Sequence, residues 1–152
     1  MEHILLPALD WSTGTVATRE MLEVEREGTN FFRLLHSPAF VDGIARGDLL
    51  ELLPDIVEGY RIIERGGYLA IVVAFPDAEA KSKSHQLLIE SLVPVAGVCE
   101  GGPSHSLVCS VPVTAGFPNV EAILNSFCHE APGTTWWFGN VYSLSGEPLG
   151  WW

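Results

Sequence analysis

Residues Arg46-Gly47-Asp48 form a tripeptide whose residue types fit three different roles. It can act as an adhesion motif, supply a catalytic aspartate, or form a tight turn. An adhesion motif requires secretion and an exposed, mobile loop, and the sequence indicates neither. Because Gly47 can adopt a positive φ and Asp48 can accept hydrogen bonds from nearby amides, the sequence favours a turn that precedes a strand.

Asp48 is also the first residue to consider for acid–base chemistry. A carboxylate acts as a general acid or base only with a partner within hydrogen-bond reach, and no fixed motif links Asp48 to another acidic residue or to a histidine. If the protein is an enzyme, we expect its site in a cleft between two subdomains, with Asp48 as the acid or base. The other candidate catalytic residues are His36, Tyr68 and Glu100.

The cysteines and histidines suggest a metal site only at first sight. Cys99, His105 and Cys109 bracket a predicted hairpin, and Cys128-His129 ends a predicted helix, but no CxxC pair is present. Cys109 and Cys128 fall on predicted apolar faces, where a free thiol behaves as a small hydrophobic side chain. The motifs G-x-S-x-G, G-x-x-x-x-G-K-[ST] and G-x-G-x-x-G are also missing, so we predict no metal and no cofactor.

Aromatic residues near the C-terminus are the candidates for binding. Trp136 and Phe138 should face one side of a predicted strand, and Trp137 the other. These three side chains belong either to the core or to an interface or pocket. Trp151 and Trp152 should dock against their own subunit or a neighbouring one, since exposed tryptophans at a chain end are unfavourable.

The elements that would position these residues divide the chain into two subdomains. We predict a tail over residues 1–17, followed by a small antiparallel β subdomain over 18–66 that forms a tightly turned sheet or partial barrel. In it, residues 18–27 and 31–35 form a hairpin. Two further short strands are expected near residues 47–53 and 59–65.

The second half has a different pattern, in which strands alternate with amphipathic helices. We predict strands at 68–75, 95–100, 106–113 and 134–142, and helices at 78–93 and 119–131. This order is the ferredoxin-like βαββαβ arrangement over residues 67–142, so the fold class is α+β, and 143–152 form an aromatic tail. Both helices cover one face of the sheet. The opposite face then needs cover from the N-terminal subdomain, a second copy or a ligand.

The charge of the chain restricts its partners. With 19 acidic and 8 basic residues the net charge is −11, which repels nucleic acid and anionic membrane surfaces. The N-terminal segment MEHILLPALDW lacks the basic region of a signal peptide, and no uncharged stretch is long enough for a membrane span. Three cysteines without CxxC spacing fit a reducing compartment, so we predict a cytoplasmic protein.

Two stretches, FFRLLHSPAFVDGIARGDLLEL and ERGGYLAIVV, resemble the uncharacterised bacterial family known as domain of unknown function 4265. The resemblance spans about residues 18–142. It rests on short motifs: Pro38 with Phe40, Gly47-Asp48, and Gly67 before a strand. Members of that family often carry a histidine after this glycine. Tyr68 stands there instead, which weakens any histidine-based activity at this position.

Two hypotheses follow. The favoured one is a non-catalytic cytoplasmic module for binding or protein interaction, which self-associates through the sheet face or the C-terminal aromatic residues, or acts as an acidic inhibitor or immunity-type protein against a basic partner. A small-molecule ligand is also possible. The alternative is a small enzyme with its site around Asp48.

Overall fold

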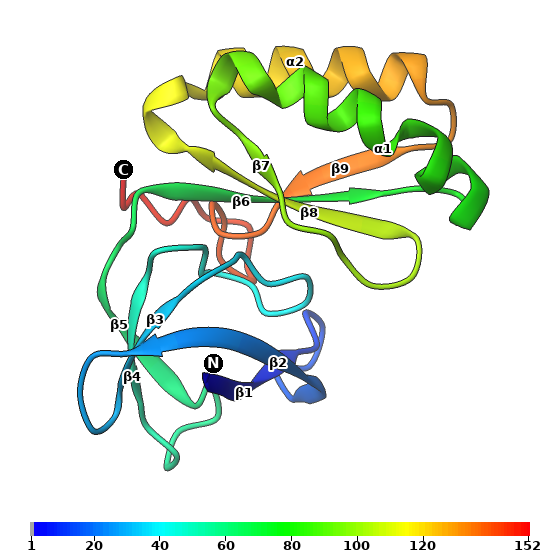
Figure 1. Ribbon diagram of the computed structural model, residues 1–152. Helices are drawn as coiled ribbons and strands as arrows, with labels where there is room; N and C mark the ends of the chain where they lie inside the picture. The colour runs from blue at the N-terminus through cyan, green and yellow to red at the C-terminus, as the bar shows by residue number, and fades with distance from the viewer. Residues whose placement is uncertain (1) are drawn as a thin grey trace.

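The computed structural model describes residues 2–152, which form two sheets lying one above the other (Figure 1). The first sheet is an antiparallel meander in the order β1-β2-β3-β4-β5 and is not a closed barrel. Its strands are β1 (Glu2–Leu9), β2 (Val16–Arg26), β3 (Phe31–Leu34), β4 (Leu49–Leu52) and β5 (Tyr60–Glu64). The predicted hairpin of residues 18–27 and 31–35 corresponds to β2 and β3.

The predicted tail over residues 1–17 is wrong, because this segment contains strand β1. β1 pairs with β2 from Glu2 opposite Val24 to Leu9 opposite Val16. The turn residues that suggested a tail form the loop of this hairpin, where the Asp10 carboxylate accepts a hydrogen bond from the Ser12 amide at 2.8 Å. A proline at position 7 obscured the strand, but an edge strand tolerates proline since one side of it makes no ladder hydrogen bonds.

The second sheet has the ferredoxin-like arrangement, which confirms the predicted α+β fold. All neighbouring strands are antiparallel, in the order β7-β8-β6-β9. Helices α1 and α2 both lie on the face turned away from the first sheet (Figure 1). The elements are β6 (Tyr68–Ala74), α1 (Ala78–Leu92), β7 (Val98–Cys99), β8 (Ser106–Pro112), α2 (Phe117–Glu130) and β9 (Thr135–Phe138), with 3-10 turns at Val93–Val95 and Val113–Ala115.

Two strands of this sheet are shorter than predicted. β7 begins late because the chain after α1 forms a 3-10 turn and then a left-handed residue, Ala96, with φ of 55°. β9 ends at Phe138. Beyond it, the side chain of Asn140 takes the place of backbone hydrogen bonds to β6. Asn140 accepts a hydrogen bond from the Ala70 amide at 2.8 Å and donates one to the Tyr68 carbonyl at 2.9 Å.

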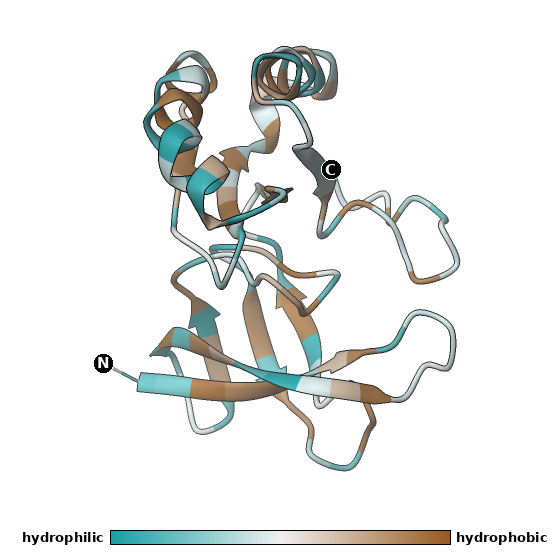
Figure 2. Cartoon of the chain, turned by 90° about the vertical axis from the view of Figure 1, so that its right-hand side faces the viewer, coloured by the Kyte–Doolittle hydropathy of each residue, from teal (hydrophilic) through white to brown (hydrophobic). Residues whose placement is uncertain are grey.

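Both faces of the second sheet are covered by the chain itself. On the helix side, alternate residues such as Leu69, Ile71 and Val73 join the core under α1 and α2. On the opposite side Val72 and Ser110 are also buried, and the Ser110 hydroxyl is hydrogen-bonded to Ser37 of the N-terminal half at 2.6 Å. Figure 2 shows apolar residues along the strands of both sheets, while the helices alternate hydrophilic and apolar positions. Neither helix in residues 2–152 has the length and apolar character needed to cross a bilayer.

Candidate functional site

Asp48 is a buried structural residue at the junction of the two sheets. Its side chain is 1% exposed. The carboxylate accepts hydrogen bonds from the amides of Ala45 at 2.9 Å and Gly66 at 2.8 Å, and its Oδ2 lies 3.3 Å from Arg65. Burial raises the pKa of Asp48 above its usual value, although the two amides and Arg65 act in the opposite direction. A carboxylate this enclosed is not displayed for adhesion.

Glycine is required where the loop of Asp48 meets the segment between β5 and β6. A Cβ built on Gly66 would lie 2.4 Å from the carbonyl carbon of Gly47, and Gly47 itself has φ of +85°. Two backbones approach this closely only when neither residue has a side chain. The two glycines therefore place the Gly66 amide within reach of Asp48.

His36 also has both of its polar atoms in use. Its Nε2 accepts a hydrogen bond from the Glu23 amide at 3.2 Å, so this nitrogen carries a lone pair. The ring proton is then on Nδ1, which lies 3.1 Å from the Ser37 carbonyl oxygen and donates to it. The backbone therefore holds both ring nitrogens of the imidazole.

Glu100 is the centre of a polar clamp between the two sheets. Its Oε2 accepts hydrogen bonds from the Ser37 amide and the Ser110 hydroxyl, both at 2.8 Å, and Oε1 lies 2.8 Å from the Arg46 guanidinium. Ser37 and Arg46 belong to the N-terminal half, whereas Glu100 and Ser110 belong to the ferredoxin-like half. The clamp, defined by these four residues, joins the halves.

The hydrogen bonds of the clamp have only one consistent direction. The Arg46 amide donates to the Ser37 hydroxyl at 3.0 Å, so this oxygen is an acceptor there. Ser110 gives its single hydroxyl proton to the Glu100 carboxylate, so it accepts in its 2.6 Å contact with Ser37, and the Ser37 hydroxyl donates to it. Ser37 and Ser110 are both buried, so their hydroxyl groups depend on this network.

The four candidate catalytic residues do not form one catalytic group. His36 and Glu100 line the same small pocket of about 160 Å³, whereas Asp48 does not line it. The Tyr68 ring lies beneath the Arg46 guanidinium, 5.8 Å from ring centre to Cζ. Since the proton-carrying atoms of His36, Glu100 and Asp48 all have partners, the arrangement stabilises the junction of the sheets.

A larger, aromatic pocket also opens beside Ala39, with a volume of about 820 Å³. Several of its wall residues are exposed apolar side chains, including Trp11, Phe40 and Trp137 at 55, 52 and 44% exposure. Two carboxylates, Asp42 and Glu121, lie among them. The pocket is lined by Trp11, Ala39, Phe40, Asp42, Glu121, Trp136, Trp137, Phe138, Tyr142 and Gly146.

Glu20, on strand β2, fixes the wall of the pocket that contains Phe40. The carboxylate of Glu20 accepts hydrogen bonds from three consecutive amides, those of Ala39, Phe40 and Val41, at 2.8 to 3.0 Å. A carboxylate that binds consecutive amides fixes the conformation of the loop. The exposed ring of Phe40 is therefore presented on a rigid segment.

Trp11 and Asp42 form the second fixed contact of the pocket. The indole Nε1 of Trp11 donates to the Asp42 carboxylate at 2.8 Å, which ties the β1–β2 loop to residues 39–42. Burial raises the pKa of Asp42 above its usual value, the Trp11 hydrogen bond lowers it, and the charge of Glu20 raises it further. Asp42 is thus a partly desolvated negative charge beside exposed aromatic rings.

The C-terminal aromatic residues separate into core and pocket positions. Trp136 and Phe138 pack against the helix-side core, where their ring centres lie 5.0 Å apart, and both also border the pocket. Trp137 points to the other side, as predicted from strand alternation. Trp151 donates to the Asn140 carbonyl at 2.8 Å, and Trp152 contacts Phe117 at 5.1 Å, so the chain end docks on its own subunit.

Comparison with known proteins identifies the family. The model of the family described as Domain of unknown function (DUF4265) matches residues 20–146. The chain belongs to the DUF4265 family. A hypothetical protein from Neisseria gonorrhoeae has a similar solved structure, with a TM-score of 0.67, 15% identity, and coverage of 91% of this chain and 95% of that chain. At this identity the likeness concerns the fold alone. No curated protein matches the sequence.

Several residues that build the site in this DUF4265 protein were missed in the sequence. Ser37 and Ser110 gave no signal, because a serine in a loop and one in a strand are ordinary. Trp11 and Asp42 are 31 positions apart, and their contact depends on strand β1, which was predicted as a tail. Other missed residues are Glu20, Phe40, Arg46, Arg65, Glu121, Asn140 and Tyr142.

Metal binding finds no support in the geometry of this DUF4265 protein. Over residues 2–152, no three His, Cys, Asp or Glu side chains are grouped in a way that could hold a metal ion. Cys99, Cys109 and Cys128 are free thiols.

Proposed function

We propose that this DUF4265 protein is a non-catalytic binding module that takes a basic segment of a partner protein, with a cationic side chain held in the aromatic pocket. The observation that carries this proposal is the combination of exposed aromatic rings with Asp42 and Glu121 in one pocket of about 820 Å³. Such walls attract a lysine or arginine side chain through both the ring faces and the carboxylates.

Charge favours the same kind of partner. The chain has a net charge of −11, and among the residues that line the pocket the only charged ones are the two carboxylates. An acidic protein attracts basic partners at long range and repels acidic ones, which raises the association rate for the correct partner.

The position of the pocket favours an extended segment. Three pocket residues, Trp136 to Phe138, lie on β9, which is one of the two edge strands of its sheet. An extended peptide can add to a sheet edge through its backbone while alternate side chains enter neighbouring pockets. In this geometry, a lysine placed opposite Trp137 would reach the rings and Asp42 together.

The contacts of the candidate catalytic residues support a non-catalytic role. A general acid or base needs an atom that is free to exchange a proton with a substrate. In His36, Asp48 and Glu100 the relevant atoms are hydrogen-bonded to the chain itself. A cytoplasmic location goes with this proposal, since free thiols are typical of reducing compartments.

The test is a tryptophan-fluorescence titration with a short blocked peptide of alternating threonine and lysine. We expect saturable quenching, which a peptide with glutamate in place of lysine does not produce. Trp137→Ala should weaken binding about five-fold or more, the effect of losing a partly desolvated cation–π contact. Trp152→Ala is the matched control, because Trp152 is similarly exposed but does not line the pocket.

Three results would overturn the proposal. One is equal affinity for the lysine and glutamate peptides, and another is lysine-peptide affinity that Trp137→Ala leaves unchanged. The third comes from a titration with tetramethylammonium at matched ionic strength. If this ion binds at the Trp137 site and the lysine peptide does not, the pocket takes a small organic cation and not a protein segment.

If the protein self-associates, we propose that a second copy contacts the C-terminal aromatic residues. The centre of the sheet face is covered by the N-terminal half, so a second copy has no access to it. We therefore expect any dimer to use exposed residues such as Trp137 and Trp152. Light scattering tests this expectation: a dimer that Trp137→Ala dissociates supports it, and a particle that stays monomeric at all concentrations contradicts it.

A further inference from the structure

Cys99 and Cys109 face each other across the edge of the second sheet. They are register partners of strands β7 and β8, and both are free thiols. The next pair along, Glu100 and Val108, makes the ladder hydrogen bond, with the Glu100 amide donating to the Val108 carbonyl at 2.8 Å. Because hydrogen-bonded and non-hydrogen-bonded pairs alternate in an antiparallel ladder, Cys99 and Cys109 form a non-hydrogen-bonded pair.

This type of pair brings two side chains close enough for a disulfide. Non-hydrogen-bonded pairs hold their Cα atoms about 4.5 Å apart, and disulfides span about 4.4 to 6.8 Å between Cα atoms. A pair of this type therefore lies within the reach of a disulfide.

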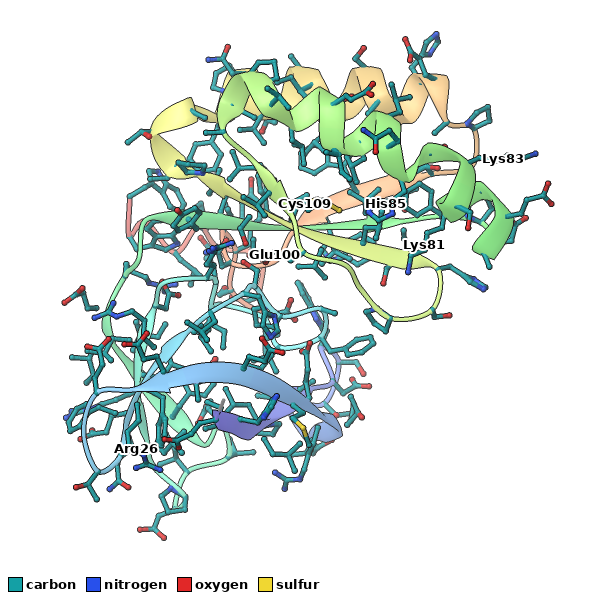
Figure 3. All side chains as sticks on the ribbon, in the orientation of Figure 1. Arg26, Lys81, Lys83, His85, Glu100 and Cys109 are labelled. Atoms are coloured by element: carbon teal, nitrogen blue, oxygen red, sulfur yellow. The ribbon has the colours of Figure 1, made fainter. Side chains whose placement is uncertain are left out.

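A histidine lies beside the two thiols. His85, on α1, is one of three groups that lower the pKa of Cys99, after Cys109 and the Gly101 amide. In Figure 3 the labelled side chains of His85 and Cys109 lie near each other between α1 and the sheet, and Glu100 lies on the other side of the sheet. Cys99 is half-buried on the edge strand, whereas Cys109 is fully buried, so a reagent reaches Cys99 first.

From this arrangement, we infer that Cys99, Cys109 and His85 form a dithiol site that exchanges with low-molecular-weight disulfides, with Cys99 as the attacking thiol and Cys109 as the resolving thiol. The site shares no residue with the aromatic pocket or the polar clamp, and its role does not depend on the proposed binding function. The clamp residues Glu100 and Ser110 are the chain neighbours of Cys99 and Cys109, and the charge of Glu100 contributes to raising the pKa of Cys109.

The electrostatics of the site fit the two roles. The Cys109 thiol, as a hydrogen-bond donor to the thiolate, is the largest influence on Cys99, and with Gly101 and His85 it lowers the pKa of Cys99 to about 6, although burial opposes this. The same interaction with Cys99, together with burial, raises the pKa of Cys109. The lowered pKa favours the thiolate form of Cys99, and thiolates are the nucleophiles in disulfide exchange.

The reaction balances in two steps. The Cys99 thiolate attacks one sulfur of a small disulfide, whose S–S bond breaks, and the first thiolate leaves. Cys109 then gives its proton to solvent, attacks the Cys99 sulfur and displaces the second thiolate. The two protein thiols are oxidised to one disulfide, and the small disulfide is reduced to two thiols. The contact that raises the pKa of Cys109 ends once Cys99 is in the mixed disulfide.

The experiment is incubation of the folded protein with oxidised glutathione, followed by intact mass, thiol counting and peptide mapping. We expect a product lighter by two hydrogen atoms, with Cys99 linked to Cys109 and Cys128 still reduced. Cys109→Ala should stop the reaction at a mixed disulfide on Cys99. Cys128→Ser is the matched control and should react as the unaltered protein does.

A second measurement is independent of whether Cys109→Ala folds. The rate of alkylation of Cys99 by iodoacetamide should reach half its maximum near pH 6, and His85→Asn should move this midpoint toward the ordinary cysteine value of about 8.5. The inference is overturned if Cys99 and Cys109 stay reduced while Cys128 reacts, or if the disulfide forms only after denaturation. The inference is also overturned if the alkylation midpoint of Cys99 lies at the ordinary cysteine value and His85→Asn does not change it.

Discussion

Two regions at the junction of the sheets contain carboxylates, yet they differ in what surrounds those carboxylates. In the polar clamp, Glu100 is 8% exposed and accepts from Ser37, Ser110 and Arg46. In the aromatic pocket, Asp42 accepts from Trp11, and exposed rings surround it. The clamp lies within the contact between the halves, whereas the pocket opens to solvent.

The comparison shows that the surroundings of a carboxylate, more than its residue type, decide what it does. A carboxylate with several internal donors stabilises the fold, and removing it leaves those donors buried without partners. A carboxylate beside exposed apolar surface contributes less to the stability of the fold, and it is available to a ligand. Substitutions in the clamp should therefore affect stability, and substitutions in the pocket should affect binding.

The largest effect is expected from Gly66→Ala, which acts on the junction beside the clamp. The new Cβ would lie 2.4 to 2.7 Å from three backbone atoms of Gly47, and neither backbone can move without breaking contacts of Asp48. We expect a loss of about 3 kcal/mol or more in the free energy of unfolding, measured by urea denaturation. Gly139→Ala is the control, since its Cβ would meet Ala70 at 3.4 Å, an ordinary contact. Equal losses in both variants would mean that the Gly47–Gly66 approach is not special.

Glu100→Ala should have the next largest effect. The Ser37 amide and the Ser110 hydroxyl lose their acceptor inside the protein, while Arg46, which is 37% exposed, can be rehydrated. Each buried donor without a partner costs about 1–3 kcal/mol, so we expect about 2 kcal/mol or more from thermal or denaturant unfolding. Glu79→Ala is the matched control.

Glu79 also forms an ion pair at 2.9 Å, with Lys83, but its side chain is 75% exposed. Exposed pairs of this kind contribute little, so Glu79→Ala should change the free energy of unfolding by less than about 0.5 kcal/mol. A clamp that stabilised only through the charge of Arg46 would make the two glutamate variants alike.

The fold was largely predictable because it rests on local patterns. The helices and strands of the ferredoxin-like half follow from periodicity and from caps such as Asp77, which accepts from the Ala80 amide at 2.8 Å. Strand β1 was missed because Pro7 and the turn residues after it outweighed a short alternation of apolar side chains.

The site was only partly predictable because its contacts join distant segments. Trp136, Trp137 and Phe138 were found, since an aromatic cluster on a strand is a local signal. Asp48 and Glu100 were named as candidate catalytic residues, but the structure gives both carboxylates internal hydrogen-bond partners, which lie on other elements. No spacing rule connects Ser37 with Ser110 or Trp11 with Asp42, because those pairs exist only after the two sheets meet.

A smaller effect, on binding and not on stability, is expected at Asp42. Asn at this position can still accept from Trp11 but has no charge, so affinity for the lysine peptide should fall about five-fold at pH 7, as for a partly exposed ion pair. In the unaltered protein, burial raises the pKa of Asp42. The carboxylate therefore gains a proton at a higher pH than an ordinary aspartate does.

Affinity for the lysine peptide should fall on acidification. Only the charged form of Asp42 attracts a cation, so affinity is highest above its pKa and falls as the pH is lowered through it. This fall should begin above the ordinary aspartate value of 3.8, and Asp42→Asn should remove the part of it that Asp42 contributes, while Glu121 keeps its charge in the variant at neutral pH. Titrations at a series of pH values check this, and an affinity that rises on acidification would contradict it.

The smallest effect is expected from Trp11→Phe, which keeps an aromatic wall and removes one hydrogen-bond donor. Trp11 is exposed, so the free energy of unfolding should stay within about 0.5 kcal/mol of the unaltered value. The Trp11 hydrogen bond lowers the pKa of Asp42, and its loss should raise that pKa further. The fall in peptide affinity on acidification should therefore begin at a higher pH, while Trp152→Phe should leave the pH profile in place. If Trp11→Phe instead lowered stability as Glu100→Ala does, the pocket would be a structural region like the clamp, and the distinction between the two would fail.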